Sequence, residues 1–170
     1  MVTIRRASGA DAEQVLEYCR LVGGESDNLT FGSEGVLFPV EAEREYLDSV
    51  LESERNAFFI AEDGGEVVGT GTFSAFEKPR LRHRGVISIT VKKSRWGEHI
   101  GTHMMEKLLD FARNSAGVDI VSLDVRSDNE RAKALYEKFG FKKIGVFDGM
   151  LQIGGEYISC DTMRLSFSGR

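Results

Sequence analysis

The residues best placed for chemistry form the segment V-K-K-S-R-W-G-E-H-I-G-T, from Val91 to Thr102. An extended run, I-S-I-T-V, leads into this segment, and a helical pattern, H-M-M-E-K-L-L-D-F-A-R, follows it. The first turn of a helix has backbone N–H groups without partners, and the helix dipole is positive there. Glycine lets a ligand approach the backbone closely. With Gly97 and Gly101 at the junction, the segment predicts a turn that can hold a pyrophosphate.

A second segment, S-D-N-E-R-A-K-A-L-Y-E-K-F-G-F, begins at Ser127. Ser127 and Glu130 have the spacing of a capping box, so we expect a helix to start at about Asp128. Asn129 then lies at the helix start and Tyr136 lies on its apolar face. Taken alone, Asn129 could be an ordinary helix-start residue and Tyr136 an ordinary core aromatic.

Together the two segments resemble the GNAT superfamily of acetyl-CoA-dependent N-acetyltransferases. The usual signature, R-x-x-G-x-G or Q-x-x-G-x-G, aligns with Trp96–Gly101, and one branch of the superfamily has a turn similar to W-G-x-G-I-G. The second segment resembles the family string N-x-x-A-x-x-L-Y-x-x-x-G-F, although the family alanine usually falls at Ala132. The remaining matches to that string are Asn129, Ala134, Leu135, Tyr136, Gly140 and Phe141.

The resemblance implies a site for acetyl-CoA. It implies that the strand Val86–Val91 diverges from Ser122–Val125 and that the pantetheine arm pairs with the backbone of the first strand. It also implies that Tyr136 is the catalytic group that protonates the departing thiolate, which is chemistry suited to a phenol. The cofactor-binding residues that it implies are Ile89, Val91, Trp96, Gly97, Glu98, His99, Ile100, Gly101, Thr102 and Asn129.

The pyrophosphate turn departs from the family pattern because His99 occupies the position of the central glycine. A side chain there requires a different backbone, and the imidazole could instead donate a hydrogen bond to a phosphate oxygen. The alternative for the whole turn is an ordinary strand–helix junction. His99 and His103 have the spacing of two metal ligands, but no third ligand and no H-E-x-x-H accompany them, so we expect no metal. Gly69 and Gly71 form a second G-x-G, which we interpret as glycines within a strand.

Hydrophobic periodicity predicts a mixed α/β fold in one domain spanning residues 1–170. The predicted order, β-α-α-β-β-β-α-β-α-β-β, is that of the GNAT fold, a central mixed sheet flanked by helices. We expect the first helix to follow a Ser8 cap and to stop at Gly23 and Gly24. The other predicted helices are 40–54, 99–113 and about 128–139, and the predicted strands are 3–7, 57–62, 66–73, 84–91, 118–125, 141–147 and 156–167.

The overall composition limits the classes of partner and the cellular compartment that we expect. The 170-residue chain has a net charge of −5, which argues against a general nucleic-acid-binding protein. It has no apolar run near 18 residues and no apolar core of a signal peptide, so we expect no membrane partner. Cys19 and Cys160 are far apart, so we interpret them as reduced thiols in a cytoplasmic protein.

These observations favour an enzyme that moves the acetyl group of acetyl-CoA directly to a primary amine of a small molecule, such as an amino acid or polyamine, or of a peptide. Neither cysteine lies in the context of a nucleophile, so no covalent enzyme intermediate is expected. The family resemblance implies a homodimer. The alternatives are an acyl-CoA-binding regulatory module without catalysis and a non-catalytic interaction domain. The fourth strand offers only Ser88 and Thr90 where many relatives carry a glutamate, so we assign no general base.

Charge is unevenly distributed along the chain. Residues 25–54 contain a single basic residue, Arg44, and nine acidic residues, which gives a local charge of −8; the acidic residues are Glu25, Asp27, Glu34, Glu41, Glu43, Glu45, Asp48, Glu52 and Glu54. In the resembled fold this region forms the wall on the acceptor side, where it would attract a cationic amine. The alternative is a solvated helix face. The basic run Arg80–Arg84 is either a solvated rim or a contact for a substrate carboxylate or cofactor phosphate.

Overall fold

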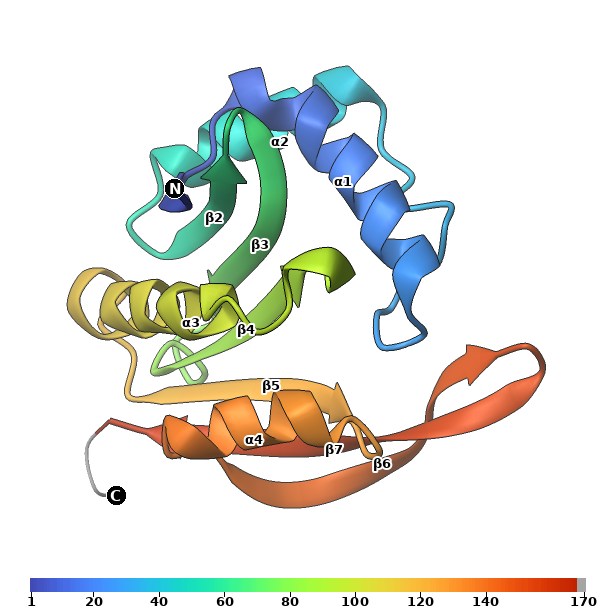
Figure 1. Ribbon diagram of the computed structural model, residues 1–170. Helices are drawn as coiled ribbons and strands as arrows, with labels where there is room; N and C mark the ends of the chain where they lie inside the picture. The colour runs from blue at the N-terminus through green and yellow to red at the C-terminus, as the bar shows by residue number, and fades with distance from the viewer. Residues whose placement is uncertain (168–170) are drawn as a thin grey trace.

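A seven-stranded sheet carries helices on both faces in the computed structural model, which describes residues 1–167 (Figure 1). The strand order is β1-β2-β3-β4-β5-β7-β6, and every neighbouring pair is antiparallel except β4 and β5. The predicted mixed sheet and the predicted order of helices and strands are therefore confirmed. The strands are β1 Thr3–Arg6, β2 Asn56–Asp63, β3 Glu66–Ala75, β4 Arg84–Val91, β5 Ile120–Arg126, β6 Lys142–Ile153 and β7 Glu156–Ser166; the helices are α1 Ala12–Glu25, α2 Val40–Leu51, α3 Ile100–Asp110 and α4 Glu130–Lys138.

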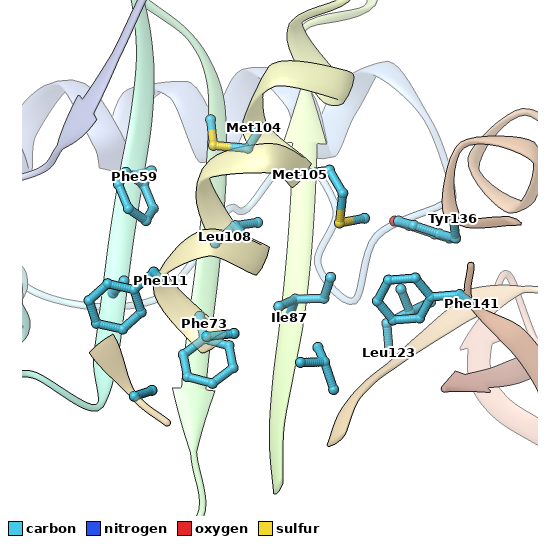
Figure 2. Close-up of a cluster of buried hydrophobic side chains, with 14 of the residues drawn as sticks. Phe59, Phe73, Ile87, Met104, Met105, Leu108, Phe111, Leu123, Tyr136 and Phe141 are labelled. Carbon is cyan, nitrogen blue, oxygen red and sulfur yellow. The ribbon is translucent and has the colours of Figure 1, made fainter. Parts of the chain in front are cut away.

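The sheet separates two hydrophobic cores. Successive side chains of a strand point to opposite faces, and in β2 Phe58 and Ile60 contact α1 and α2, whereas Phe59 belongs to the core beneath α3 and α4. Figure 2 shows that second core, where Phe59, Phe73 and Phe111 gather at one end and Tyr136 and Phe141 at the other. The cofactor elements predicted from the sequence, α3 and α4, thus cover one face, and α1 and α2 cover the other.

The parallel strands β4 and β5 pair over only a short length. Their register joins Arg84 to Ile120, Gly85 to Val121 and Val86 to Ser122, after which the two strands no longer pair. β4 continues to Val91 and β5 to Arg126, so a gap widens between them (Figure 1). The predicted divergence of these strands is confirmed, and residues from elements on both faces of the sheet line a groove at this point.

The first helix runs through both glycines that we expected to end it. α1 extends to Glu25, and a Cβ at Gly23 would stand 1.9 Å from the backbone oxygen of Gly32. Gly23 is therefore a point of close approach between α1 and the following loop, where no side chain would fit. The helix ends two residues later than predicted, and this difference carries Glu25 into the region of the site.

Other boundaries also differ from the prediction. α2 ends at Leu51 instead of residue 54, and the helix predicted over 99–113 consists of α3 followed by a π-helical turn, Phe111–Ser115. The predicted capping box at Ser127 is wrong. Ser127 Oγ donates to Asp161 at 2.6 Å, and Asn129 caps α4 by accepting a hydrogen bond from the backbone N–H of Ala132 at 3.2 Å. β6 is longer than expected and forms with β7 a hairpin that extends toward the loop after α1 (Figure 1).

Candidate active site

A groove of about 260 Å³ lies where β4 and β5 diverge, between the α3 N-terminus, α4 and the end of α1. It collects nearly all of the residues that the sequence predicts for a cofactor site. Those lining it are Ile89, Val91, Trp96, Gly97, His99, Ile100, Gly101, Thr102, Asn129 and Tyr136. Two segments separated by about thirty residues of chain therefore meet at one cavity.

The turn before α3 has an unusual backbone. His99 has φ 61° and ψ 12°, and it is the only non-glycine residue in 1–167 with positive φ. Gly97 also has positive φ, at 93°. The first helical hydrogen bond runs from the N–H of His103 to the carbonyl of His99. The N–H groups of Ile100, Gly101 and Thr102, in the first turn of α3, therefore have no partner within the helix. The junction thus presents free donors at the positive end of a helix dipole.

Trp96 forms part of the groove wall at this turn. Its indole N–H donates to the carbonyl oxygen of Val91 at 2.9 Å, which anchors the side chain to the end of β4. The guanidinium of Arg131, from α4, lies 4.6 Å from the centre of the Trp96 ring. This cation–π contact joins the turn and α4 across the groove.

Glu98 is the one expected cofactor residue that does not line the groove. Its carboxylate accepts hydrogen bonds from Arg95 at 2.8 and 3.0 Å, and Arg95 also donates to Asp63 at 2.9 Å. The contact with Arg95 lowers the pKa of Glu98 below its ordinary value. Glu98 therefore ties the turn to the end of β2.

Tyr136 lies on the wall of the groove with only 8% of its surface exposed. Burial raises its pKa to about 12, so the phenol stays protonated at neutral pH. The hydroxyl makes no hydrogen bond with any other residue in 1–167, and in Figure 2 it points toward Met105 of α3. A protonated, unpartnered hydroxyl at the strand gap can donate to a ligand atom.

Asn129 combines two functions at the start of α4. Its side-chain oxygen caps the helix by accepting from Ala132, while its amide nitrogen has no hydrogen-bond partner among the described residues. The capping bond fixes the side-chain orientation beside the groove. The free N–H₂ group can therefore donate to a carbonyl of a bound molecule.

Side chains of β4 alternate between the two faces of the sheet. Ile89 and Val91 pack against the core under α3, whereas Thr90 bonds to Tyr18 of α1 at 3.0 Å and to Thr70 at 2.7 Å. The Ser88 hydroxyl lies 3.3 Å from that of Thr72. Both β4 hydroxyls therefore have hydroxyl partners on neighbouring elements.

Several groove residues were missed by the sequence prediction. They come from the end of α1, the loop after it, β4, the turn before α3 and α4, and they are Val22, Glu25, Ser26, Asn28, Leu29, Thr90, Arg95, Arg131, Ala132 and Leu135. Four of them, Glu25, Ser26, Asn28 and Leu29, follow the predicted helix stop at Gly23 and Gly24, so the prediction assigned them no place in the fold. Only the acidic bias of residues 25–54 pointed toward this region.

The remaining candidates lie elsewhere. Within residues 1–167, no group of three or more His, Cys, Asp or Glu side chains is arranged to hold a metal ion. The run Arg80–Arg84 lies at the start of β4, at the opposite end from the groove, and Arg84 stacks on Phe76 at 5.2 Å. In the same part of the chain, no helix is both long enough and apolar enough to cross a bilayer.

Comparison with known proteins identifies one family. The model of the acetyltransferase (GNAT) family matches residues 27–141. The chain is similar to the N-alpha-acetyltransferase RimI of Mycobacterium tuberculosis, with 33% identity over 105 residues, which are 62% of this chain and 64% of that protein. The aligned segment thus spans slightly less than two thirds of this relative.

Solved structures show the same fold. An acetyltransferase of the GNAT family from Streptococcus pneumoniae superposes with a TM-score of 0.94 at 25% identity, over 98% of this chain and 100% of that chain. The yncA protein of Salmonella typhimurium, whose structure contains its cofactor acetyl-CoA, has a TM-score of 0.84 at 18% identity, over 99% and 95% of the two chains.

Proposed function

The chain belongs to the GNAT family of acetyl-CoA-dependent acetyltransferases, and we propose that it transfers the acetyl group directly to a primary amine of a small molecule or peptide. The observation that carries the proposal is the gap between β4 and β5, because it places Tyr136, Asn129 and the α3 N-terminus around one groove.

In this proposal the cofactor occupies the groove in two parts. The pyrophosphate binds the free N–H groups at the α3 N-terminus, contributed by Ile100, Gly101 and Thr102, with Trp96, Gly97 and His99 around them. The pantetheine arm lies along β4, where the backbone of Ile89 and Val91 replaces the hydrogen bonds of a missing strand. Glu98 acts on the turn through Arg95 and not by contact with the cofactor.

The chemistry follows from the chain's own groups. The acceptor must lose a proton, because an ammonium ion has no free electron pair. Its nitrogen attacks the acetyl carbonyl, a C–N bond forms, and the C–S bond breaks to release the CoA thiolate. Tyr136 donates its proton or a hydrogen bond to that sulfur, and Asn129 donates its amide N–H to the pantetheine. Solvent water takes the proton that the ammonium loses before attack, and the second proton, which leaves nitrogen as the amide forms, returns through water to the phenol.

A non-catalytic acyl-CoA-binding module would share the groove but not the turnover. We would measure acetyl-CoA binding by calorimetry and the release of free CoA with a panel of amino acids, polyamines, aminoglycosides and peptides. Binding with release of CoA supports the transferase. Binding without release for every amine supports the regulatory module, and absence of binding by the folded protein contradicts both.

We also propose a cytoplasmic homodimer. Cys19 and Cys160 are both unpaired and buried, as suits a reducing compartment. The edge strand β6 exposes Ile144, Val146 and Phe147, which offers an apolar surface to a second copy. Light scattering of the purified chain tests the dimer, and replacement of Phe147 by Glu should then yield monomers.

A further inference from the structure

The strand gap gives the proposed acceptor its own side of the sheet. Ile89 and Val91 face the α3 and α4 side, where the cofactor groups lie, while Thr90 faces α1. Residues from the end of α1 and its following loop line the same groove. An amine that meets the thioester from the opposite side of the sheet therefore passes along α1.

Among the residues that the structure describes, Glu25 is the only carboxylate that lines the groove. It is the last residue of α1, where the helix dipole is negative, and its Oε2 atom accepts a hydrogen bond from the backbone N–H of Lys93 at 2.7 Å. That bond fixes the carboxylate beside the end of β4 and leaves its second oxygen for another donor. Carboxylate and helix end together favour an ammonium group.

A second cleft, of about 350 Å³, lies next to the groove at this point. Ser26 and Leu29 belong to the walls of both. The second cleft lies between the loop after α1 and the end of the β6–β7 hairpin, which contributes Met150–Ile153 to its lining. Within residues 1–167, its lining contains Asp27 and Glu34 and no Lys, Arg or His.

The two arginines that line the groove, Arg95 and Arg131, are engaged in contacts away from the proposed acceptor path. Arg95 is paired with Asp63 and Glu98, and Arg131 stacks on Trp96 from α4. An acceptor carboxylate would therefore meet Glu25, Asp27 and Glu34, while Arg126, which donates to the Asp27 carbonyl at 3.2 Å, is already paired with Asp128. This argues against free amino acids as acceptors.

From the two adjacent clefts and their acidic residues we infer the class of acceptor: an extended chain with a primary amine at one end and a second cationic group farther along. The reactive amine passes Glu25 into the groove, and the second cation lies near Asp27 and Glu34 in the second cleft. A polyamine and a peptide N-terminus followed by a basic residue share this chemistry. The inference rests on the proposed function and names the substrate class of the same site.

Only part of the acidic stretch contributes to this inference. Asp48 accepts from the backbone N–H of Gly9 at 2.6 Å, Glu43 is buried against α1, and Glu41 pairs with Arg44. These residues line neither cleft. The acidic character of α2 is therefore separate from acceptor binding, and Glu45, which is exposed on α2, provides a matched control.

The test compares kcat/KM for pairs of acceptors that differ by one charge. Alanyl-lysine amide is paired with alanyl-norleucine amide, and 1,4-diaminobutane with pentylamine; free alanine is the anionic comparison. We expect the dicationic member of at least one pair to be preferred about tenfold, the effect of one charge-assisted hydrogen bond. The pair that shows the preference indicates whether the acceptor is a peptide N-terminus or a polyamine. Equal kcat/KM within both pairs, or a preference for free alanine, overturns the inference.

Substitutions test which carboxylate contributes to binding of which cationic group. Glu25→Gln keeps an oxygen for Lys93 and should raise KM about tenfold for every primary amine with acetyl-CoA affinity unchanged. Glu34→Gln together with Asp27→Asn should remove the preference for the dication only, and Glu45→Gln should change nothing. Equal effects of the Glu34 and Glu45 variants, or an unchanged KM in Glu25→Gln, contradict the inference. Absence of CoA release with every acceptor instead contradicts the proposed function.

Discussion

Gly101 of α3 and Leu135 of α4 approach so closely that a Cβ on Gly101 would stand 3.2 Å from Leu135 Cδ2. Both residues line the groove. The glycine therefore lets two helices meet beside the proposed pyrophosphate position, and any side chain at 101 must displace Leu135 or project into the space for the cofactor.

Replacement of Gly101 by Asp should abolish measurable binding of acetyl-CoA. The carboxylate would repel the pyrophosphate, and its bulk would close the groove against Leu135. The expected loss is that of several charge-assisted hydrogen bonds, roughly 1.5–3 kcal/mol each. Calorimetry measures the affinity, and circular dichroism checks the fold. Gly101→Ala, which requires only a small shift of Leu135, should reduce affinity far less. A folded Asp variant with wild-type affinity would remove the cofactor from this turn.

Tyr136→Phe should lower the rate of CoA release about 10²-fold and leave acetyl-CoA affinity unchanged. The substitution keeps the ring against Phe141 and removes only the hydroxyl, which has no other partner in residues 1–167. Single-turnover kinetics measure the chemical step. Equal rates in the two proteins would make Tyr136 a core aromatic only.

The same substitution tests the pKa of Tyr136, which burial raises from 10.0 to about 12. A raised phenol pKa stabilises the folded state below pH 10, and this contribution is lost as pH rises from 10 toward 12. Between pH 9 and pH 11 the wild type should lose roughly 1 kcal/mol more unfolding free energy than Tyr136→Phe. Urea titrations at the two pH values measure the difference, and parallel losses would contradict the buried, protonated phenol.

Asn129 can be tested by separating its two functions. Asn129→Ser keeps an oxygen that can cap α4 and removes the amide donor, so it should weaken acetyl-CoA binding with little change in stability. Asn129→Ala removes both and should also cost about 1 kcal/mol of unfolding free energy. Denaturant unfolding and calorimetry on the two variants provide the measurements. Unchanged affinity in both would limit Asn129 to helix capping.

The sequence predicts the residues of the proposed cofactor site better than those of the proposed acceptor site, for a physical reason. The residues of the turn and of α4 are close in sequence within each segment, and local rules of helix starts and glycine spacing determine their chemistry. Glu25 and the β6–β7 hairpin are far apart along the chain. Only tertiary packing places Glu25 on the groove and the hairpin on the adjacent second cleft. The capping box failed similarly, because Asp161 of β7, remote in sequence, takes the Ser127 hydroxyl.

Added salt should lower kcat/KM for a dicationic acceptor more than for a monoamine. Glu25, Asp27 and Glu34 line clefts that solvent reaches, and charges of this kind are screened beyond about 10 Å at 0.1 M ionic strength. Initial rates between 20 and 300 mM KCl, with acetyl-CoA saturating, measure the effect. The Glu25→Gln, Asp27→Asn, Glu34→Gln triple variant should show a flatter dependence. Identical slopes in both proteins would assign the salt effect to charges elsewhere.

Replacement of His99 by Gly tests whether the strained turn serves the cofactor. A left-handed backbone costs a non-glycine residue roughly 1–2 kcal/mol, part of which the greater chain entropy of glycine offsets. His99→Gly should therefore raise the unfolding free energy by about 0.5–1 kcal/mol. If the imidazole donates to a phosphate oxygen, acetyl-CoA affinity should fall despite the gain in stability. His103→Gln, on the same helix but outside the groove, should alter neither quantity. Tighter acetyl-CoA binding by His99→Gly would mean that the side chain obstructs the site.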